Sequence, residues 1–194
     1  MKKIITVSGQ YAGGAWDVGK HLADSLGVPF YDDVGISDKM ETLSAETSAV
    51  MGARFFSLAT GVCDAVGAET CADIPEADRL FLARRDAIRA IASEGPCVIV
   101  AEGSEFLLDP ADCFCVFVTA DLSAREEKEM RTKAVTLRSA VKRLAETDRR
   151  RAAYCRFYAN GEWGKPEGYA LCINGSLFGA EGASEIIKNA LKEI

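Results

Sequence analysis

The chain has 194 residues, of which 48% are hydrophobic and 27% are charged, and its formal net charge is −6. This length suffices for one domain with a substantial core, and the composition is that of an ordinary soluble protein. The negative charge argues against nonspecific binding of nucleic acid or of acidic membranes, so we expect neither as a partner.

The first predicted element is a buried strand, Ile4–Val7, which runs into a glycine-rich turn and then a helix over 16–26. Strand, glycine turn and helix in this order are how a P-loop begins. The P-loop pattern is G-x-x-x-x-G-K-[ST]: its backbone N–H groups surround phosphates, its lysine adds a charge and its hydroxyl binds Mg²⁺.

The motif fits the turn in two alignments, and neither is complete. The first starts at Gly9 and reaches Gly14, but Ala15 and Trp16 then replace the lysine and the hydroxyl residue. We favour this alignment because Gly9 closely follows the strand, as the motif requires.

The second alignment starts at Gly14 and ends with Lys20, which keeps the lysine and replaces only the hydroxyl residue. It would need 17–20 to be a loop, whereas Val18 and Leu22 already mark the apolar face of a helix. A third interpretation is an ordinary strand–turn–helix whose glycines serve only tight packing. The residues alone leave a phosphate site and this simpler structure about equally supported.

The rest of the chain alternates between short apolar runs and helical patterns. Strands are predicted at Pro29–Tyr31, Cys97–Ala101, Cys113–Thr119 and Tyr169–Ile173. Helices are predicted at 35–48, 50–67, from Pro75 to Gly95, and at 122–130, 134–158 and 181–193. This alternation predicts an α/β fold, a parallel sheet of about five strands covered by helices on both faces. Ligands of such sheets bind beyond the carboxyl ends of the strands.

The cysteines and the single histidine do not form a metal-binding pattern. His21 cannot build a site alone, and we expect it on a helix surface. The seven cysteines contain no C-x-x-C pair and are expected mostly as buried, reduced side chains; they are Cys63, Cys71, Cys97, Cys113, Cys115, Cys155 and Cys172. With no signal-peptide pattern after Met1 and no run of transmembrane length, we expect a cytoplasmic protein.

Four segments carry a resemblance to a known family. They are IITVSGQYAGGAWDVGKHLADSLGVPFYD at 4–32, GPCVIVAEGSEFLL at 95–108, TDRRRAAYCRFY at 147–158 and EWGKPEGYALCINGSLFGAEGASEII at 162–187. Together they resemble the cytidylate kinase-like family of P-loop nucleoside monophosphate kinases. The resemblance implies a three-layer P-loop NTPase-like fold in a single domain over 1–194, with a phosphate-binding turn at 8–16, monophosphate-side helices at about 34–94 and a helical lid at about 122–160.

Such a kinase transfers the γ-phosphoryl group of ATP to CMP or a related small acceptor, with Mg²⁺ as the metal ion. The nucleotide-binding residues that the resemblance implies are Ser8, Gly9, Gly13, Gly14, Lys20, Arg125 and Arg131. Those implied in catalysis are the lid arginines Arg149, Arg150 and Arg156. Those implied in acceptor binding are Asp32, Glu102, Tyr158 and Asn174. The guanidinium groups of these arginines can donate hydrogen bonds to several phosphate oxygens at once. The alternative is that the arginines form a charged helix face exposed to solvent.

Glu102 is also a candidate magnesium ligand, because a carboxylate that ends an apolar strand beside a P-loop can hold Mg²⁺. Glu105 is a second candidate one helical turn further on. The alternative is that both are surface acids that cap a short helix, and this alternative is slightly favoured.

The chain departs from the family pattern at three cationic positions. Arginines commonly follow the first serine and the glycine pair of the family's turn, where this chain has Gly9 and Trp16. The family strand that usually ends Gly-Arg-Gly ends here with Glu102, which reverses the charge. The alternative function is therefore a catalytically impaired member that binds a nucleotide or another phosphorylated ligand in a regulatory role. A nucleic-acid-binding role for the basic segment 131–156 lacks a recognition motif, and the oligomeric state stays open.

Overall fold

The structure is a computed structural model that describes residues 4–51, 75–159 and 161–193. The chain divides into two compact units, Met1–Asp32 with Gly95–Ile194, and Asp33–Glu94. The second unit spans nearly the same residues as the predicted monophosphate-side helices. That the whole chain works as one domain stays a prediction.

The first unit is built on a five-stranded parallel sheet with the strand order β2-β3-β1-β4-β5. Its strands are β1 (Ile4–Gly9), β2 (Phe30–Tyr31), β3 (Cys97–Ile99), β4 (Cys113–Thr119) and β5 (Leu171–Asn174). The prediction of an α/β fold with about five parallel strands is thus confirmed. The central strand β1 is buried along its whole length, as its continuous apolar sequence predicts.

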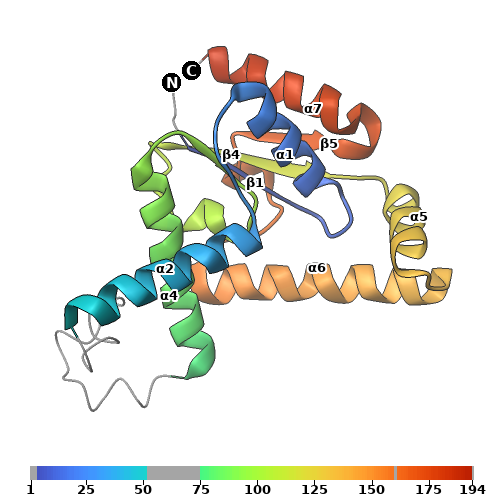
Figure 1. Cartoon of the computed structure of the whole chain (residues 1–194). Coiled ribbons are helices and arrows are strands. Elements are labelled where there is room, and N and C mark those ends of the chain that lie inside the picture. Colours follow the sequence, from blue (N-terminus) through green and yellow to red (C-terminus); the bar gives the residue numbers. More distant parts are fainter. Residues whose placement is uncertain (1–3, 52–74, 160, 194) are drawn as a thin grey trace. The chain divides into compact units, whose positions relative to one another are not determined.

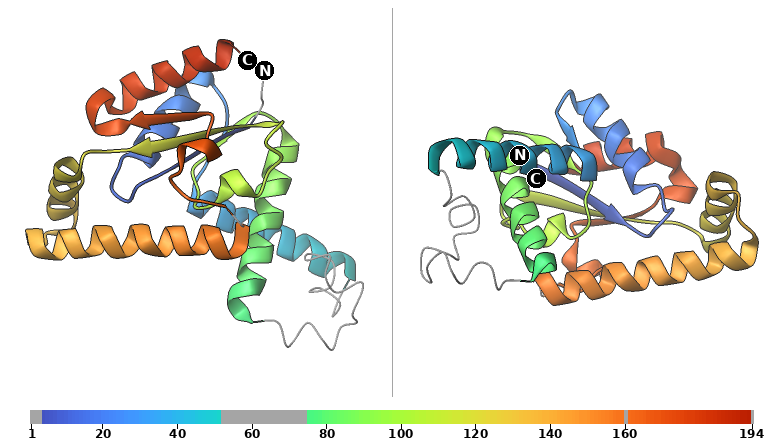
Figure 2. Two further views of the ribbon diagram at one scale, coloured as in Figure 1. Left: turned by 180° about the vertical axis from the view of Figure 1, so that it is seen from behind. Right: turned by 60° about the horizontal axis from the view of Figure 1, so that its bottom comes forward.

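Helices cover both faces of this sheet. The helices of the unit are α1 (Ala15–Leu26), α5 (Leu122–Lys133), α6 (Leu137–Ala159) and α7 (Gly175–Lys192). Figures 1 and 2 show α1 and α7 side by side on one face and the long α6 on the other, which gives three layers. The core between α1, α7 and the sheet includes Val7, Leu22, Val116 and Ile187. Two short 3₁₀ turns, Ser104–Phe106 and Pro166–Gly168, complete the unit.

The second unit contains α2 (Asp33–Met51) and α4 (Glu76–Glu94). The predicted helix at 50–67 falls almost wholly outside the described residues, as do Cys63 and Cys71. Among the described cysteines, Cys97, Cys113, Cys115 and Cys155 are buried, as expected, whereas Cys172 is exposed. No helix in the described ranges combines the length and the hydrophobicity that a bilayer crossing requires.

Two helices begin three or more residues away from the predicted start. The helix predicted from 134 begins at Leu137, because Ala134 adopts a left-handed conformation (φ 52°) that ends α5 instead. The helix predicted from 181 begins at Gly175, where the side chain of Asn174 caps its first turn. Gly179 interrupts this helix with non-helical angles (φ 67°, ψ 176°), so the apolar periodicity becomes regular only after it.

Candidate active site

The glycine-rich turn connects the carboxyl end of β1 to α1, at the centre of the sheet. A β-carbon at Gly9 would lie 2.4 Å from the carbonyl oxygen of Val118, and one at Gly13 would lie 2.8 Å from that of Gln10. Gly14 has a left-handed φ of 91° and precedes α1 without a side-chain cap. Each glycine is thus required by local geometry, as in a phosphate-binding turn.

The structure resolves the choice between the two P-loop alignments. Asp17 to Lys20 are helical, so the alignment that starts at Gly14 cannot form a loop. The Lys20 ammonium lies 2.5 Å from the Asp24 carboxylate on the same helix. It does not line the pocket that lies between the turn, α1, α5 and the start of α7. The alignment from Gly9 therefore describes the turn, with Ala15 and Trp16 at the lysine and hydroxyl positions.

Two side chains from α5 and α6 bind the backbone of Tyr11 in the turn. The Asp148 carboxylate accepts a hydrogen bond from the Tyr11 N–H at 2.8 Å, and the Arg125 guanidinium donates to the Tyr11 carbonyl at 2.8 Å. Arg125 also forms an ion pair with Asp148, and their side chains are only 6% and 20% exposed. This buried pair fixes the turn to both helices. Arg125 was predicted to bind nucleotide, and here its charge is already paired within the protein.

Arg151 provides a third contact to the turn. Its guanidinium donates to the Gly9 carbonyl at 2.8 Å, stacks over the Tyr11 ring at 5.6 Å and lies 3.8 Å from the Glu102 carboxylate. The charge of Glu102, reversed with respect to the family pattern, is therefore balanced by an arginine of α6. Nearby, the side chain of Ser8 does not face the turn but donates to Glu105.

The residues around the turn do not fit a protein-held Mg²⁺. At the hydroxyl position, the Trp16 indole N–H donates to the Asp32 carboxylate at 2.9 Å, and its ring packs edge-on against Phe30. Glu102, the candidate ligand, lies beside a cation. No group of three histidine, cysteine or acidic side chains within the described ranges is placed to hold a metal ion.

Glu105 lies in a buried polar cluster close to the end of β1. Its side-chain oxygen Oε1 accepts hydrogen bonds from the Ser8 hydroxyl and the Tyr169 hydroxyl, both at 2.9 Å. The other oxygen, Oε2, is buried and has no hydrogen-bond partner among the described residues. Burial raises the pKa of Glu105 above the ordinary carboxyl value of 4.5, and the nearby Glu102 contributes to this shift. Glu105 is thus not one of the surface acids that the alternative interpretation described.

We expect the raised pKa of Glu105 to make the protein less stable as pH rises. The folded protein favours protonated Glu105, so the stabilisation is complete below about pH 4.5 and is lost as pH rises through the raised pKa. Urea unfolding across this pH range measures the free energy of unfolding. In Glu105→Gln this free energy should not show the decrease expected for wild type, so the variant should gain stability relative to wild type as pH rises. Glu146→Gln, at an exposed position on α6, should follow the wild-type profile; a parallel profile for Glu105→Gln would contradict the assignment.

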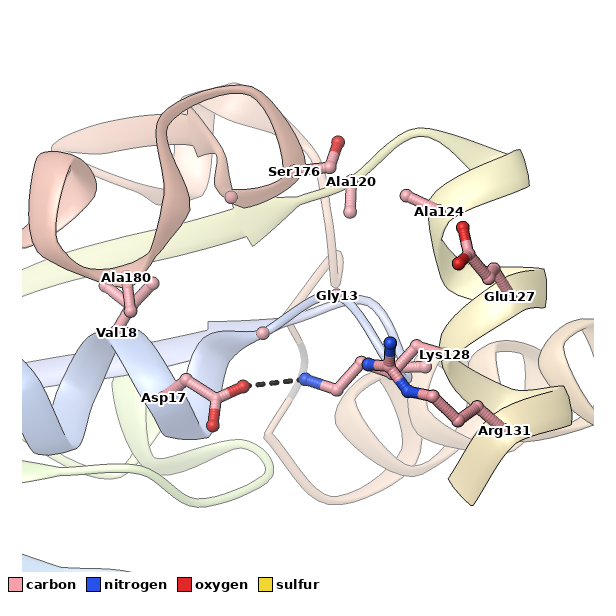
Figure 3. Close-up of a pocket in the computed structure, with 13 residues that line it drawn as sticks. Gly13, Asp17, Val18, Ala120, Ala124, Glu127, Lys128, Arg131, Ser176 and Ala180 are labelled. Carbon is pink, nitrogen blue, oxygen red and sulfur yellow. Dashed lines mark hydrogen bonds and ion pairs between the residues drawn. The ribbon is translucent and has the colours of Figure 1, made fainter. Parts of the chain in front are cut away.

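A pocket of about 510 Å³ lies beside the turn (Figure 3). Its walls come from the turn, α1, α5 and the start of α7. The lining residues are Ala12, Gly13, Gly14, Asp17, Val18, Ala120, Ala124, Glu127, Lys128, Arg131, Gly175, Ser176 and Ala180. Lys128 forms an ion pair with Asp17 at 2.6 Å. Arg131 extends from α5 beside Lys128. Within the described part of the chain it makes no ion pair or hydrogen bond.

The structure brings together only part of the predicted nucleotide-binding set. Gly13, Gly14 and Arg131 line the pocket, and Gly9 ends the strand that leads to it. Their role as nucleotide ligands stays a prediction.

The predicted lid and acceptor residues lie in different surroundings. Arg149, Arg150 and Arg156 are exposed on α6. Tyr158, near the end of that helix, packs against Tyr154 with ring centroids 5.1 Å apart. Asn174 caps α7, since its side-chain oxygen accepts from the backbone N–H groups of the two residues after Gly175. The catalytic and acceptor-binding roles also stay predictions.

Sequence reasoning did not assign Asp148 and Arg151 to the turn. Both lie in the basic run of α6. Their contacts to Tyr11 and Gly9 span 137 and 142 residues, so no local spacing signals them.

Comparison with known proteins agrees with this architecture. The model of the cytidylate kinase-like family matches residues 4–177. An uncharacterised protein from Eubacterium ventriosum superposes with a TM-score of 0.75 at 21% identity, over the full length of both chains. Shikimate kinase from Bacteroides thetaiotaomicron gives a TM-score of 0.53 at 14% identity, covering 97% of this chain and 98% of that one. No curated protein is significantly similar in sequence.

A second shikimate kinase, that from Acinetobacter baumannii in complex with shikimate, gives a TM-score of 0.52 at 15% identity. It covers 98% of this chain and 94% of its own. At these identities the likeness shows a shared fold, that of P-loop kinases.

Proposed function

The chain belongs to the cytidylate kinase-like family, and on that premise we propose that it is a nucleotide-binding protein of the cytoplasm with suppressed phosphoryl transfer. The pocket beside the turn carries this proposal. Its volume of about 510 Å³ lies in the range of small-ligand sites. The uncapped first turn of α1 supplies N–H groups suited to a phosphate, and Arg131 supplies a positive charge that is paired with no described residue.

Suppressed transfer follows from the charges around the turn. Phosphoryl transfer depends on cations that neutralise the transferred group, above all a lysine, arginines and Mg²⁺. Here Ala15 and Trp16 remove the lysine and the hydroxyl, and the arginines that reach the turn are engaged by acids, Arg125 by Asp148 and Arg151 by Glu102. ATP remains a candidate ligand, whereas the residues present argue against a protein-held Mg²⁺.

The second candidate is ATP-dependent phosphoryl transfer to CMP or a related acceptor. The observation that favours it is the row of exposed arginines on α6, Arg149, Arg150 and Arg156, on the helix that contacts the turn. A coupled assay of ATP turnover across the common nucleoside monophosphates distinguishes the two candidates. We expect no turnover above background; turnover at rates typical of kinases would establish the second candidate instead.

Removing the cation of the pocket should weaken nucleotide binding. We expect Arg131→Ala to lower the affinity about tenfold or more, because a charge-assisted hydrogen bond to phosphate contributes about 1.5–3 kcal/mol. Isothermal titration calorimetry with adenosine and cytidine phosphates measures the change. Lys133→Ala, on the same helix outside the pocket, is the matched control and should bind as wild type. Equal affinities of the two variants, or no binding by wild type at millimolar nucleotide, would contradict the proposal.

A further inference from the structure

A carboxylate of the chain itself accepts a hydrogen bond from a backbone N–H of the glycine-rich turn. The Tyr11 N–H donates to Asp148 at 2.8 Å, and Tyr11 immediately precedes Ala12, which lines the pocket. Successive backbone N–H groups of such a turn are anion-binding groups. Asp148 thus holds the place that an oxygen of an anionic ligand would take at this N–H.

Two further N–H groups of the turn are engaged by backbone carbonyls. The Gln10 N–H donates to Val118 at 3.0 Å, and the Gly13 N–H donates to Gln10 at 2.9 Å. The N–H groups of Ala12 and Gly14 remain as donors, together with those of the first turn of α1, which Gly14 leaves without a side-chain cap. Because Gly14 and Asp17 line the pocket, this helix end faces the ligand.

The pocket holds two acids and two cations, so its formal side-chain charge is zero. Asp17 and Glu127 are negative, and Lys128 and Arg131 are positive. The ion pair between Lys128 and Asp17 leaves Arg131 as the available cation within the described part of the pocket. Tyr11, next to Ala12 in the turn, and Asp148 lie outside this lining. A phosphate chain long enough to extend past Ala12 would approach the Asp148 carboxylate, and like charges repel.

We propose that the pocket selects a nucleoside carrying one phosphate over the corresponding triphosphate, and that Asp148 is the residue that sets this limit. The inference rests on the proposed function and names the ligand class of the same pocket. Asp148 acts in two ways, because its carboxylate occupies the Tyr11 N–H and neutralises Arg125. Loss of the carboxylate would release a backbone donor and a cation at the same point of the turn.

Calorimetric titrations with AMP, ATP, CMP and CTP in metal-free buffer test this inference. Asp148→Asn removes the charge but keeps an oxygen that can accept from the Tyr11 N–H, whereas Asp148→Ser is too short to reach it. Glu146→Gln is the matched control, since Glu146 lies on the same helix, is exposed and pairs only loosely with Lys142 at 3.7 Å. Thermal melts of each variant verify folding, and Asp148→Asn suffices if the serine variant does not fold.

For wild type and Glu146→Gln we expect the monophosphate to bind more tightly than the triphosphate. Triphosphate affinity should rise about tenfold in Asp148→Asn and further in Asp148→Ser, with monophosphate affinity changed less than twofold. Wild-type binding of the triphosphate as tight as that of the monophosphate or tighter, or an unchanged ratio in both Asp148 variants, would overturn the inference while leaving nucleotide binding intact. Binding of none of the four nucleotides would overturn the proposed function and this inference with it.

Discussion

Replacement of Gly9 by alanine is expected to lower the free energy of unfolding by about 3 kcal/mol. The added β-carbon would lie 2.4 Å from the carbonyl oxygen of Val118 and 3.1 Å from the Val118 β-carbon. Because the first of these atoms belongs to the backbone, the β1–β4 pairing itself must shift to make room. Urea denaturation followed by circular dichroism measures the effect.

The matched control for this substitution is Gly182→Ala in α7. There the β-carbon would meet only the Phe178 β-carbon at 3.5 Å, an ordinary contact, so alanine should stabilise by about 0.5–1 kcal/mol through its helix propensity. If Gly9→Ala were as stable as wild type, the close approach of β1 and β4 would be incorrect. The same geometry predicts that the family's arginine cannot be restored at position 9 without a large loss of stability.

Replacement of Arg125 by methionine is expected to cost about 3–5 kcal/mol of folding free energy. Methionine keeps much of the side-chain volume but leaves the Asp148 carboxylate, only 20% exposed, without its cation. It also removes the hydrogen bond to the Tyr11 carbonyl, so the turn loses its contact with α5. Chemical denaturation at neutral pH gives the loss directly.

Arg131→Met, six residues further along α5, is the matched control, because it removes the same charge from an exposed position. Arg131 is exposed and makes no ion pair with any described residue, so its replacement should change stability by less than about 0.5 kcal/mol. A difference of less than 1 kcal/mol between the Arg125 and Arg131 variants would show that the pair with Asp148 does not hold the turn.

The fold was largely predictable because its signals are local. Continuous apolar runs such as Cys113–Thr119 correspond to buried parallel strands, and the strand–turn–helix around Gly9 is where the sequence placed it. Boundaries were less predictable where one residue's conformation decides them. The left-handed Ala134 ends a helix, and the cap at Asn174 starts one earlier than the hydrophobic periodicity indicates.

The candidate site was predictable in its glycines but not in its charge pairing. Gly13 and Gly14 follow from the motif because backbone geometry fixes those residue types. The pairing of Arg125 with Asp148 depends on how α5 and α6 pack near the turn, and sequence spacing carries no information about it. The arginines of α6 were therefore interpreted as phosphate ligands or as a solvated helix face, whereas Arg151 is engaged by Gly9 and Glu102.

We propose that the pocket beside the turn binds a nucleoside phosphate, and a crystal structure of the protein soaked with AMP or CMP decides whether it does. We expect density for one phosphate at the first turn of α1, within hydrogen-bond distance of Gly14 or Ala15 N–H and of the Arg131 guanidinium. Nucleotide density elsewhere on the protein, with this pocket holding none at saturating ligand, would contradict the account.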